Sequence, residues 1–184
     1  SLLEARSEAE RLRAEVQELR QRMIQSEFAR QENVTLRRLL NYLEGARFPE
    51  DYDPVFVEVI GRSPGAFSQA ITIAAGTDAG VRVEDPVITA DGLVGIVTRV
   101  TGGTARVQLL TDPEAAVSAI DLRTGASGIV LHDRGTRETL VLDRVRKQDR
   151  IRRGDEIVTA GWRAGGLSSF YPKGIPIGEV TSVG

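Results

Sequence analysis

His132 is the single histidine of the chain, so it provides the one imidazole available for acid–base chemistry or metal binding. A Ser–His–Asp triad needs a carboxylate that orients the imidazole ring and a serine hydroxyl within its reach. Asp133 is the adjacent residue and would point to the other side of a strand, and no serine lies in a glycine-flanked nucleophile motif. We therefore interpret His132 as a surface residue and expect no catalytic residue.

Two acidic pairs, Glu84-Asp85 and Asp155-Glu156, have the residue types of a glycosidase. A sugar cleft would also need aromatic platforms, and aromatic residues make up only 5% of the chain. We therefore interpret both pairs as turn residues.

Composition excludes further chemistry. The 184 residues contain no cysteine, which rules out disulfides, iron–sulfur clusters, thiolate nucleophiles and cysteine-bound zinc. With 24 basic and 26 acidic side chains the net charge is −2, which argues against a nucleic-acid surface. The glycines of "GLVGIV" lack the lysine and the strand–loop–helix context of a phosphate-binding loop, so they indicate positive φ angles or close backbone approaches instead. We expect no cofactor and no metal.

A sharp change of composition divides the chain. Residues 1–44 contain no Gly or Pro, whereas all 19 glycines and 7 prolines follow. Four segments are predicted: a coiled-coil helix at 1–44, a linker at 45–54, and β-subdomains at 55–120 and 121–184. The fold is thus predicted to be mainly β, with a long N-terminal coiled-coil helix followed by two small β-barrel-like subdomains.

The helix has heptad periodicity. Complementary charges occupy g and following e positions, which reach between chains in a parallel dimer; the pairs are Glu8–Arg13, Glu15–Arg20, Arg22–Glu27 and Glu32–Arg37. After Ser26 the phase slips by about three residues, a stammer, and Asn33 then becomes a polar a residue, which favours two strands. The predicted homodimer seam consists of Leu12, Val16, Leu19, Met23, Asn33, Leu36, Leu40 and Leu43. A solitary amphipathic helix packed on the following domain is the alternative.

The remainder is punctuated by short Val/Ile/Thr-rich runs that predict antiparallel strands. They are residues 55–61, 69–76, 85–92, 93–100, 105–111, 139–145, 155–161 and 175–183. "LLTDPEAAVSA" would lie near the junction of the subdomains. An internal repeat supports two related subdomains, because "VRVEDPVITA" at 81–90 aligns without gaps with "IRRGDEIVTA" at 151–160.

Together these strings resemble the rod-shape-determining MreC family. The resemblance rests on the heptad helix, then "ITIAAGTDAGVRVEDPVITADGLVGIVTRV", "ARVQLLTDPEAAVSA", "RIRRGDEIVTAG" and "FYPKGIPIGEV", in that order. Asp85 departs from the glycine more usual there, and "WRAGGLSSFYPKG" is longer than the usual link.

The resemblance implies a dimeric, non-enzymatic scaffold of the cell-elongation machinery that controls rod shape and organises peptidoglycan synthesis. It implies that the protein self-associates and binds the elongation-specific class B penicillin-binding protein and MreD, linking wall synthesis to the MreB system. It also implies an extracytoplasmic (periplasmic) body, anchored in the cell membrane by a single N-terminal helix absent from this sequence, which we take to be a fragment.

Other interpretations remain. Phe170 and Tyr171 are expected to pack in a core, or else to face a partner, since aromatic residues are enriched at interface centres. A periplasmic adaptor of a secretion or efflux assembly also combines a coiled coil with β-domains, but it normally has a returning helix, which this chain lacks. A β-barrel protease is a third, weaker alternative.

Overall fold

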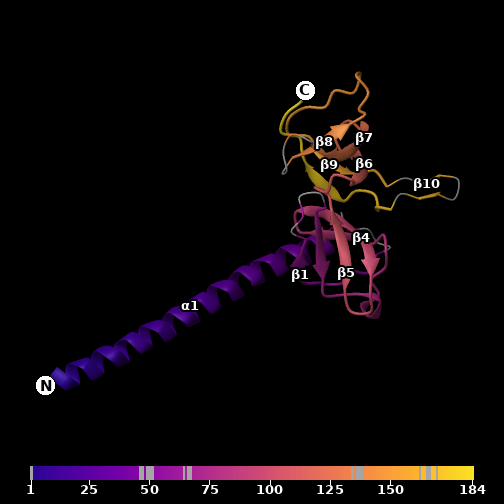
Figure 1. Ribbon diagram of the computed structural model, residues 1–184. Coiled ribbons are helices and arrows are strands. Elements are labelled where there is room, and N and C mark those ends of the chain that lie inside the picture. The colour runs from indigo at the N-terminus through magenta and orange to yellow at the C-terminus, as the bar shows by residue number, and fades with distance from the viewer. Residues whose placement is uncertain are drawn as a thin grey trace. The chain divides into compact units, whose positions relative to one another are not determined.

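The computed structural model describes residues 2–45, 48, 52–63, 65, 68–133, 135, 139–161, 163–164, 167–168 and 170–184. The chain divides into two compact units, residues 1–42 and 43–184. The first is helical and the second is built of β-strands, which confirms the predicted mainly β fold with a long helix (Figure 1).

The helical unit is one uninterrupted helix, α1 (Leu2–Glu44). Its 43 residues correspond to a rod of about 65 Å at 1.5 Å per residue. The absence of Gly and Pro explains the continuity, since no residue removes a hydrogen bond or loosens the backbone. Among the described residues, no helix has the combination of length and apolar character that a membrane span requires.

The first sheet is antiparallel, with strand order β1-β2-β5-β4-β3. Its elements are β1 (Val59–Arg62), β2 (Ala70–Ile73), the 3-10 turn η1 (Thr77–Ala79), β3 (Pro86–Thr89), β4 (Gly92–Val100) and β5 (Ala105–Leu109). Ile73, Val97 and Val107 are almost fully buried and form the centre of its core.

The second sheet is also antiparallel, with strand order β12-β9-β6-β7-β8. Its strands are β6 (Ala116–Asp121), β7 (Ser127–His132), β8 (Leu140–Asp143), β9 (Glu156–Thr159) and β12 (Pro176–Glu179). Strands β10 (Arg163–Ala164) and β11 (Leu167–Ser168) form a separate two-stranded sheet. They lie within "WRAGGLSSFYPKG", the segment that is longer than the usual link. Neither five-stranded sheet closes on itself through the described strands, so the barrels are open.

Two strands of the second sheet were not predicted. The sequence pattern places β6 in the junction between the subdomains and the end of β7 in a turn, although β7 contains Ile129, Val130 and Leu131 in succession. Both strands nevertheless lie at the middle of the sheet, because Val117, Ala119 and Val130 are buried in its core. Strand β6 is hydrogen-bonded to β7 along one edge and to β9 along the other, so it is an interior strand of the sheet.

The predicted repeat is confirmed in the local structure. The carboxylate oxygen Oδ2 of Asp85 accepts the backbone N–H of Arg82 at 2.8 Å, and Oδ2 of Asp155 accepts that of Arg152 at 2.7 Å. The residue before each aspartate, Glu84 or Gly154, has a positive φ, of 76° and 90° respectively.

The strands that follow these turns also correspond. Backbone hydrogen bonds join Glu84 and Asp85 to Val97, and the same pattern joins Gly154 and Asp155 to Val180. Strand β3 therefore matches β9, and β4 matches β12. In the first copy the two strands are joined by residues 90–91, whereas in the second copy residues 160–175, including the β10–β11 hairpin, take their place.

The two sheets share a core. Leu93 of β4 and Leu110 are buried together with Val117, Val130 and Ile157 of the second sheet. Strands β4 and β12 also contact each other directly. A Cβ atom added at Gly92 would overlap the carbonyl oxygen of Pro176, so this junction requires glycine.

Candidate partner-binding surfaces

The predicted coiled-coil seam is uncovered in the single chain. Leu12, Val16, Leu19, Met23, Leu36 and Leu40 are between 43% and 68% exposed. Asn33 is exposed and Leu43 is half-buried. Most of these apolar side chains thus remain largely exposed to solvent in the single chain. This is the state expected of one helix of a coiled coil without its partner.

Several charged side chains of the helix form ion pairs or hydrogen bonds with other residues of the same helix. Arg22 binds Glu18 at 2.6 Å, and Arg30 binds Glu27 at 2.8 Å. The Nε atom of Arg37 donates to the Oδ1 atom of Asn33 at 2.7 Å. The guanidinium of Arg30 lowers the pKa of the Glu27 carboxyl. In the single chain, Arg22, Glu27 and Arg37 thus use one-turn neighbours in place of the predicted interchain partners.

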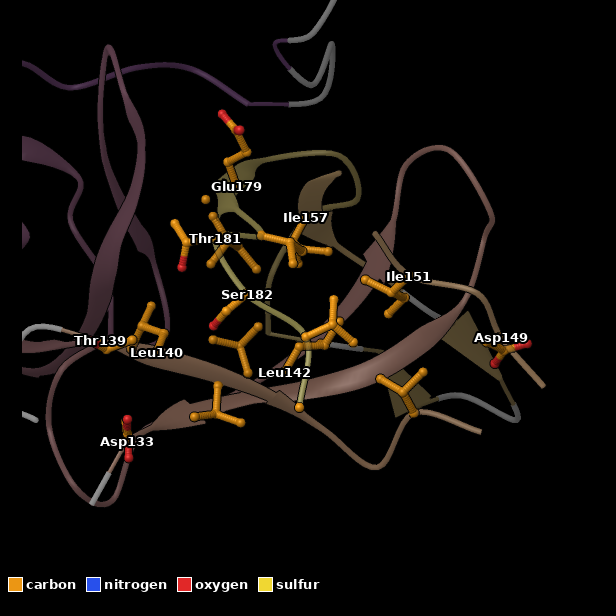
Figure 2. A pocket seen from close by; sticks show the side chains of 18 of the residues that line it. Asp133, Thr139, Leu140, Leu142, Asp149, Ile151, Ile157, Glu179, Thr181 and Ser182 are labelled. Carbon is orange, nitrogen blue, oxygen red and sulfur yellow. The ribbon is translucent and has the colours of Figure 1, made fainter. Parts of the chain in front are cut away.

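A hollow lined by both polar and apolar side chains opens on the second sheet between the edge strand β8 and the segment that follows β12 (Figure 2). Its volume is about 670 Å³. Leu142 of β8, Ile157 of β9 and Ser182 of the C-terminal segment come from separate elements and lie around the same space. The sequence did not indicate this hollow, because the residues that line it come from segments that only the order of the strands in the sheet brings together.

A partly buried ion pair fixes the turn before β9. The Nε and Nη2 atoms of Arg123 each donate to a carboxylate oxygen of Asp155 at 2.7 Å, and Nη2 also donates to the carbonyl of Arg150 at 2.8 Å. Asp155 is only 7% exposed. The hydrogen bonds from Arg123 hold the pKa of the Asp155 carboxyl far below its ordinary value. Asp155 is therefore a structural turn residue, as predicted, although its ion pair was not foreseen.

Two further aspartates are buried next to turns. Asp112, 3% exposed, accepts hydrogen bonds from the backbone of Gln69 and Glu114 and from the Gln108 side chain. Asp121, 0% exposed, accepts the backbone N–H groups of Arg123 and Thr124 through Oδ1. Asp112 lies in the "TDP" sequence, whose Asp-Pro step was the available signal for such a turn.

The neighbouring aromatic residues differ. Phe170 is 59% exposed, whereas Tyr171 is 7% exposed and packs in the shared core. Burial raises the pKa of the Tyr171 phenol. Core packing therefore holds for Tyr171, and the partner-facing alternative is wrong for this residue. Phe170 remains a predicted contact residue.

The surroundings of His132 differ from those of a triad histidine in one respect that the structure describes. The residue is half-buried at the end of β7, so the predicted surface position is only partly right. The Asp133 carboxylate accepts the backbone N–H of Gly135 at 2.8 Å and does not orient the ring. Within the described part of the chain, no three acidic or histidine side chains gather in a way that would hold a metal ion.

The sequence matches known proteins over most of its length. The Caulobacter vibrioides cell shape-determining protein MreC is 34% identical over 171 residues, which is 93% of this chain and 46% of that protein. The Listeria monocytogenes protein of the same name is 31% identical over 182 residues, 96% of this chain and 58% of that protein. The chain thus spans about half the length of the curated relatives it matches.

Solved structures agree. A chain named MreC superposes with a TM-score of 0.71 at 35% identity, covering 84% of this chain and 82% of that one. A Helicobacter pylori MreC solved in a complex with a penicillin-binding protein (PBP2) has the same fold, with a TM-score of 0.53 at 18% identity over 68% of this chain and 75% of that one.

The family model described as rod shape-determining protein MreC, barrel core, matches residues 59–184. That range begins at β1 and includes both sheets and their shared core. The chain belongs to the rod shape-determining MreC family.

Proposed function

We propose that this chain is the extracytoplasmic part of a non-enzymatic dimeric scaffold in the bacterial cell-elongation machinery. The match of residues 59–184 to the MreC barrel core carries the proposal, and the relatives are named as cell shape-determining proteins. In this role the protein controls rod shape by organising the enzymes of peptidoglycan synthesis.

The helix is proposed to join two copies. Its exposed apolar seam, with one polar a residue at Asn33, suits a parallel two-stranded coil. A rod of about 65 Å would space the β-bodies from a membrane anchor that precedes residue 1 in the whole protein. This arrangement places the β-bodies on the periplasmic side of the cell membrane.

The β-body is proposed to bind the other components. The Helicobacter pylori complex of MreC with PBP2 supports an elongation-specific class B penicillin-binding protein as one partner. MreD and, through it, the MreB system complete the proposed set. A scaffold that binds one conformation of the synthase more tightly would raise the population of that conformation without any chemistry of its own.

Affinity capture of the full-length protein from its own envelope tests the proposal. We expect recovery of a class B penicillin-binding protein together with MreD. The Leu19→Asp/Leu36→Asp variant should lower dimer content and capture less of the synthase, whereas Arg11→Asp, a charge change at a position outside the a, d, e and g positions, should behave as the unaltered protein. Recovery of export-channel components without any penicillin-binding protein would favour the secretion-adaptor alternative and overturn the proposal.

A further inference from the structure

The free edge of the first sheet exposes a run of apolar side chains. Strand β1 is the outermost strand there, and among the described residues it pairs with β2 alone (Figure 1). Val55, Phe56, Val59 and Ile60 are 46%, 57%, 60% and 57% exposed. Val57, between them, packs against the core of this sheet and fixes the segment in place. We refer to residues 55–62 as the β1 edge.

The β1 edge has one irregularity and few charges among the features that keep sheet edges apart. Natural edges are usually protected by charged side chains, prolines or bulges. This edge has a register irregularity between Val59 and Gly61, which discourages a continuous backbone ladder with another strand. It has only two charges, Glu58 and Arg62, and neither forms an ion pair within the described part of the chain. Contact through side chains therefore suits this edge.

The charges of the β1 edge are complementary to those of a second copy. Glu58 lies two residues before Ile60, and Arg62 lies two residues after it. When two identical segments cross antiparallel at a two-fold axis near Ile60, each Glu58 faces Arg62 of the other copy. Opposite charges at facing positions stabilise such a pair, and like charges destabilise it.

We propose that the β1 edge is a self-complementary contact between two copies of this chain, with Ile60 at the two-fold axis. This inference rests on the dimer proposed above, because the coiled coil would tether the two β-bodies to each other. Tethering of this kind gives an effective concentration of roughly millimolar. The exposed β1-edge side chains are too few to form a stable interface of about 800 Å² per partner, but under tethering a small patch is sufficient.

A cysteine substitution tests the contact directly, because the chain has no cysteine of its own. Ile60→Cys should form a disulfide-linked dimer under mild oxidation, since residues at the axis approach within the roughly 4.4–6.8 Å between Cα atoms that a disulfide requires. Val83→Cys is the matched control, because Val83 is 53% exposed and precedes β3 at the opposite edge of the same sheet. We expect about tenfold more linked dimer for Ile60→Cys, in line with this geometric requirement.

Charge reversal provides an independent readout. In the Ile60→Cys background, Glu58→Arg should reduce the yield of linked dimer about fivefold, because two like-charged pairs replace two opposite pairs. Adding Arg62→Glu should restore the yield. A structural defect caused by either substitution would not be repaired by the second one.

A cysteine in the helix seam distinguishes a failure of this inference from a failure of the proposed coiled-coil dimer. Leu19→Cys should link through the helix seam. If Leu19→Cys links while Ile60→Cys links no better than Val83→Cys, the coiled-coil dimer stands and the β1 contact is overturned, leaving that edge to another protein. If neither links, the dimer and this inference both fail. If Ile60→Cys alone links with the expected charge dependence, the β1 contact stands and the coil is wrong.

Discussion

Gly92 shows how one residue holds the two halves of the β-body together. It begins β4 with a φ of 129°, a conformation that other residues adopt only with strain. The backbone of Pro176, in the matching strand of the second repeat, occupies the space where a side chain would begin. Both the local conformation and the contact between sheets therefore depend on the missing Cβ.

Gly92→Ala should destabilise the β-body by about 2–4 kcal/mol, because the added methyl group both strains the backbone and separates β4 from β12. Gly103→Ala is the control, since no atom lies within 4 Å of a Cβ built there. Urea unfolding followed by far-UV circular dichroism measures both. Equal midpoints for the two variants would contradict the role given to Gly92.

The ion pair of Asp155 predicts a pH-dependent stability. Arg123 holds the pKa of this carboxyl below its unfolded value of about 3.9. The stabilisation is therefore fully present above pH ~4 and is lost as the pH falls through the folded pKa. Asp155→Asn should lower the urea midpoint at pH 7 more than Asp85→Asn does, because Asp85 caps the equivalent turn with no guanidinium partner among the described residues.

The difference between Asp155→Asn and Asp85→Asn should shrink as the pH is lowered below about 4. Midpoints measured at pH 7, 5, 4 and 3 follow the effect. A difference that stays constant with pH would mean that the ion pair contributes nothing and that Asp155 acts only through its backbone hydrogen bond.

The residue scale also shows where sequence reasoning ends. Gly92 was predicted to need a positive φ or a close approach, because it lies between two strand patterns, and this was right. Phe170 and Tyr171 have similar apolar character and adjacent positions, yet only Tyr171 is buried. Which of two neighbours faces the core depends on the path of the turn, which periodicity does not contain.

At the scale of elements, the helix was the most predictable part. Forty-four residues without Gly or Pro and with heptad periodicity leave little alternative to a helix. The exposed Ile24 and Phe28 flank the predicted phase slip after Ser26, so apolar side chains leave the seam there. The strands β6 and β7 were not predicted, although the run Ile129–Leu131 in β7 was an available strand signal; β6, with two alanines and a serine, has a weaker one.

Asn33 provides the element-scale prediction. In a dimer a polar a residue is buried at the seam and reduces stability while favouring two strands. Asn33→Leu should therefore raise the stability of the coil by about 1–3 kcal/mol and allow trimers or larger species to form. Thermal melting of the helical signal and sedimentation equilibrium measure the two effects.

Thr35→Ala controls for helix propensity, because Thr35 lies outside the predicted a and d positions. If Asn33→Leu leaves both the melting temperature and the oligomer distribution unchanged, Asn33 does not lie at a seam. The hydrogen bond from Arg37 to Asn33 would then be the whole of its role.

At the scale of the whole molecule, the repeat suggests that the two halves of the β-body fold independently, whereas the shared core suggests that they fold together. Repeated halves are able to fold separately when each has its own core, and the first sheet has one around Ile73, Val97 and Val107. The second core, however, includes Leu93 and Leu110 from the first half of the body. The second sheet is therefore incomplete without β4, and the two sheets should unfold together.

Leu93→Ala tests this coupling. The residue is 6% exposed and contacts the core of the second sheet from β4, so its truncation should lower the free energy of unfolding by about 2–5 kcal/mol. Hydrogen exchange of the β6 and β7 amides should report the loss as strongly as that of the β4 and β5 amides, because both would exchange only through a common opening. Val83→Ala, at an exposed position, should change neither set. Loss of protection confined to one sheet would show that the halves unfold independently, and the contact between β4 and β12 would then be a surface on which the two halves can separate.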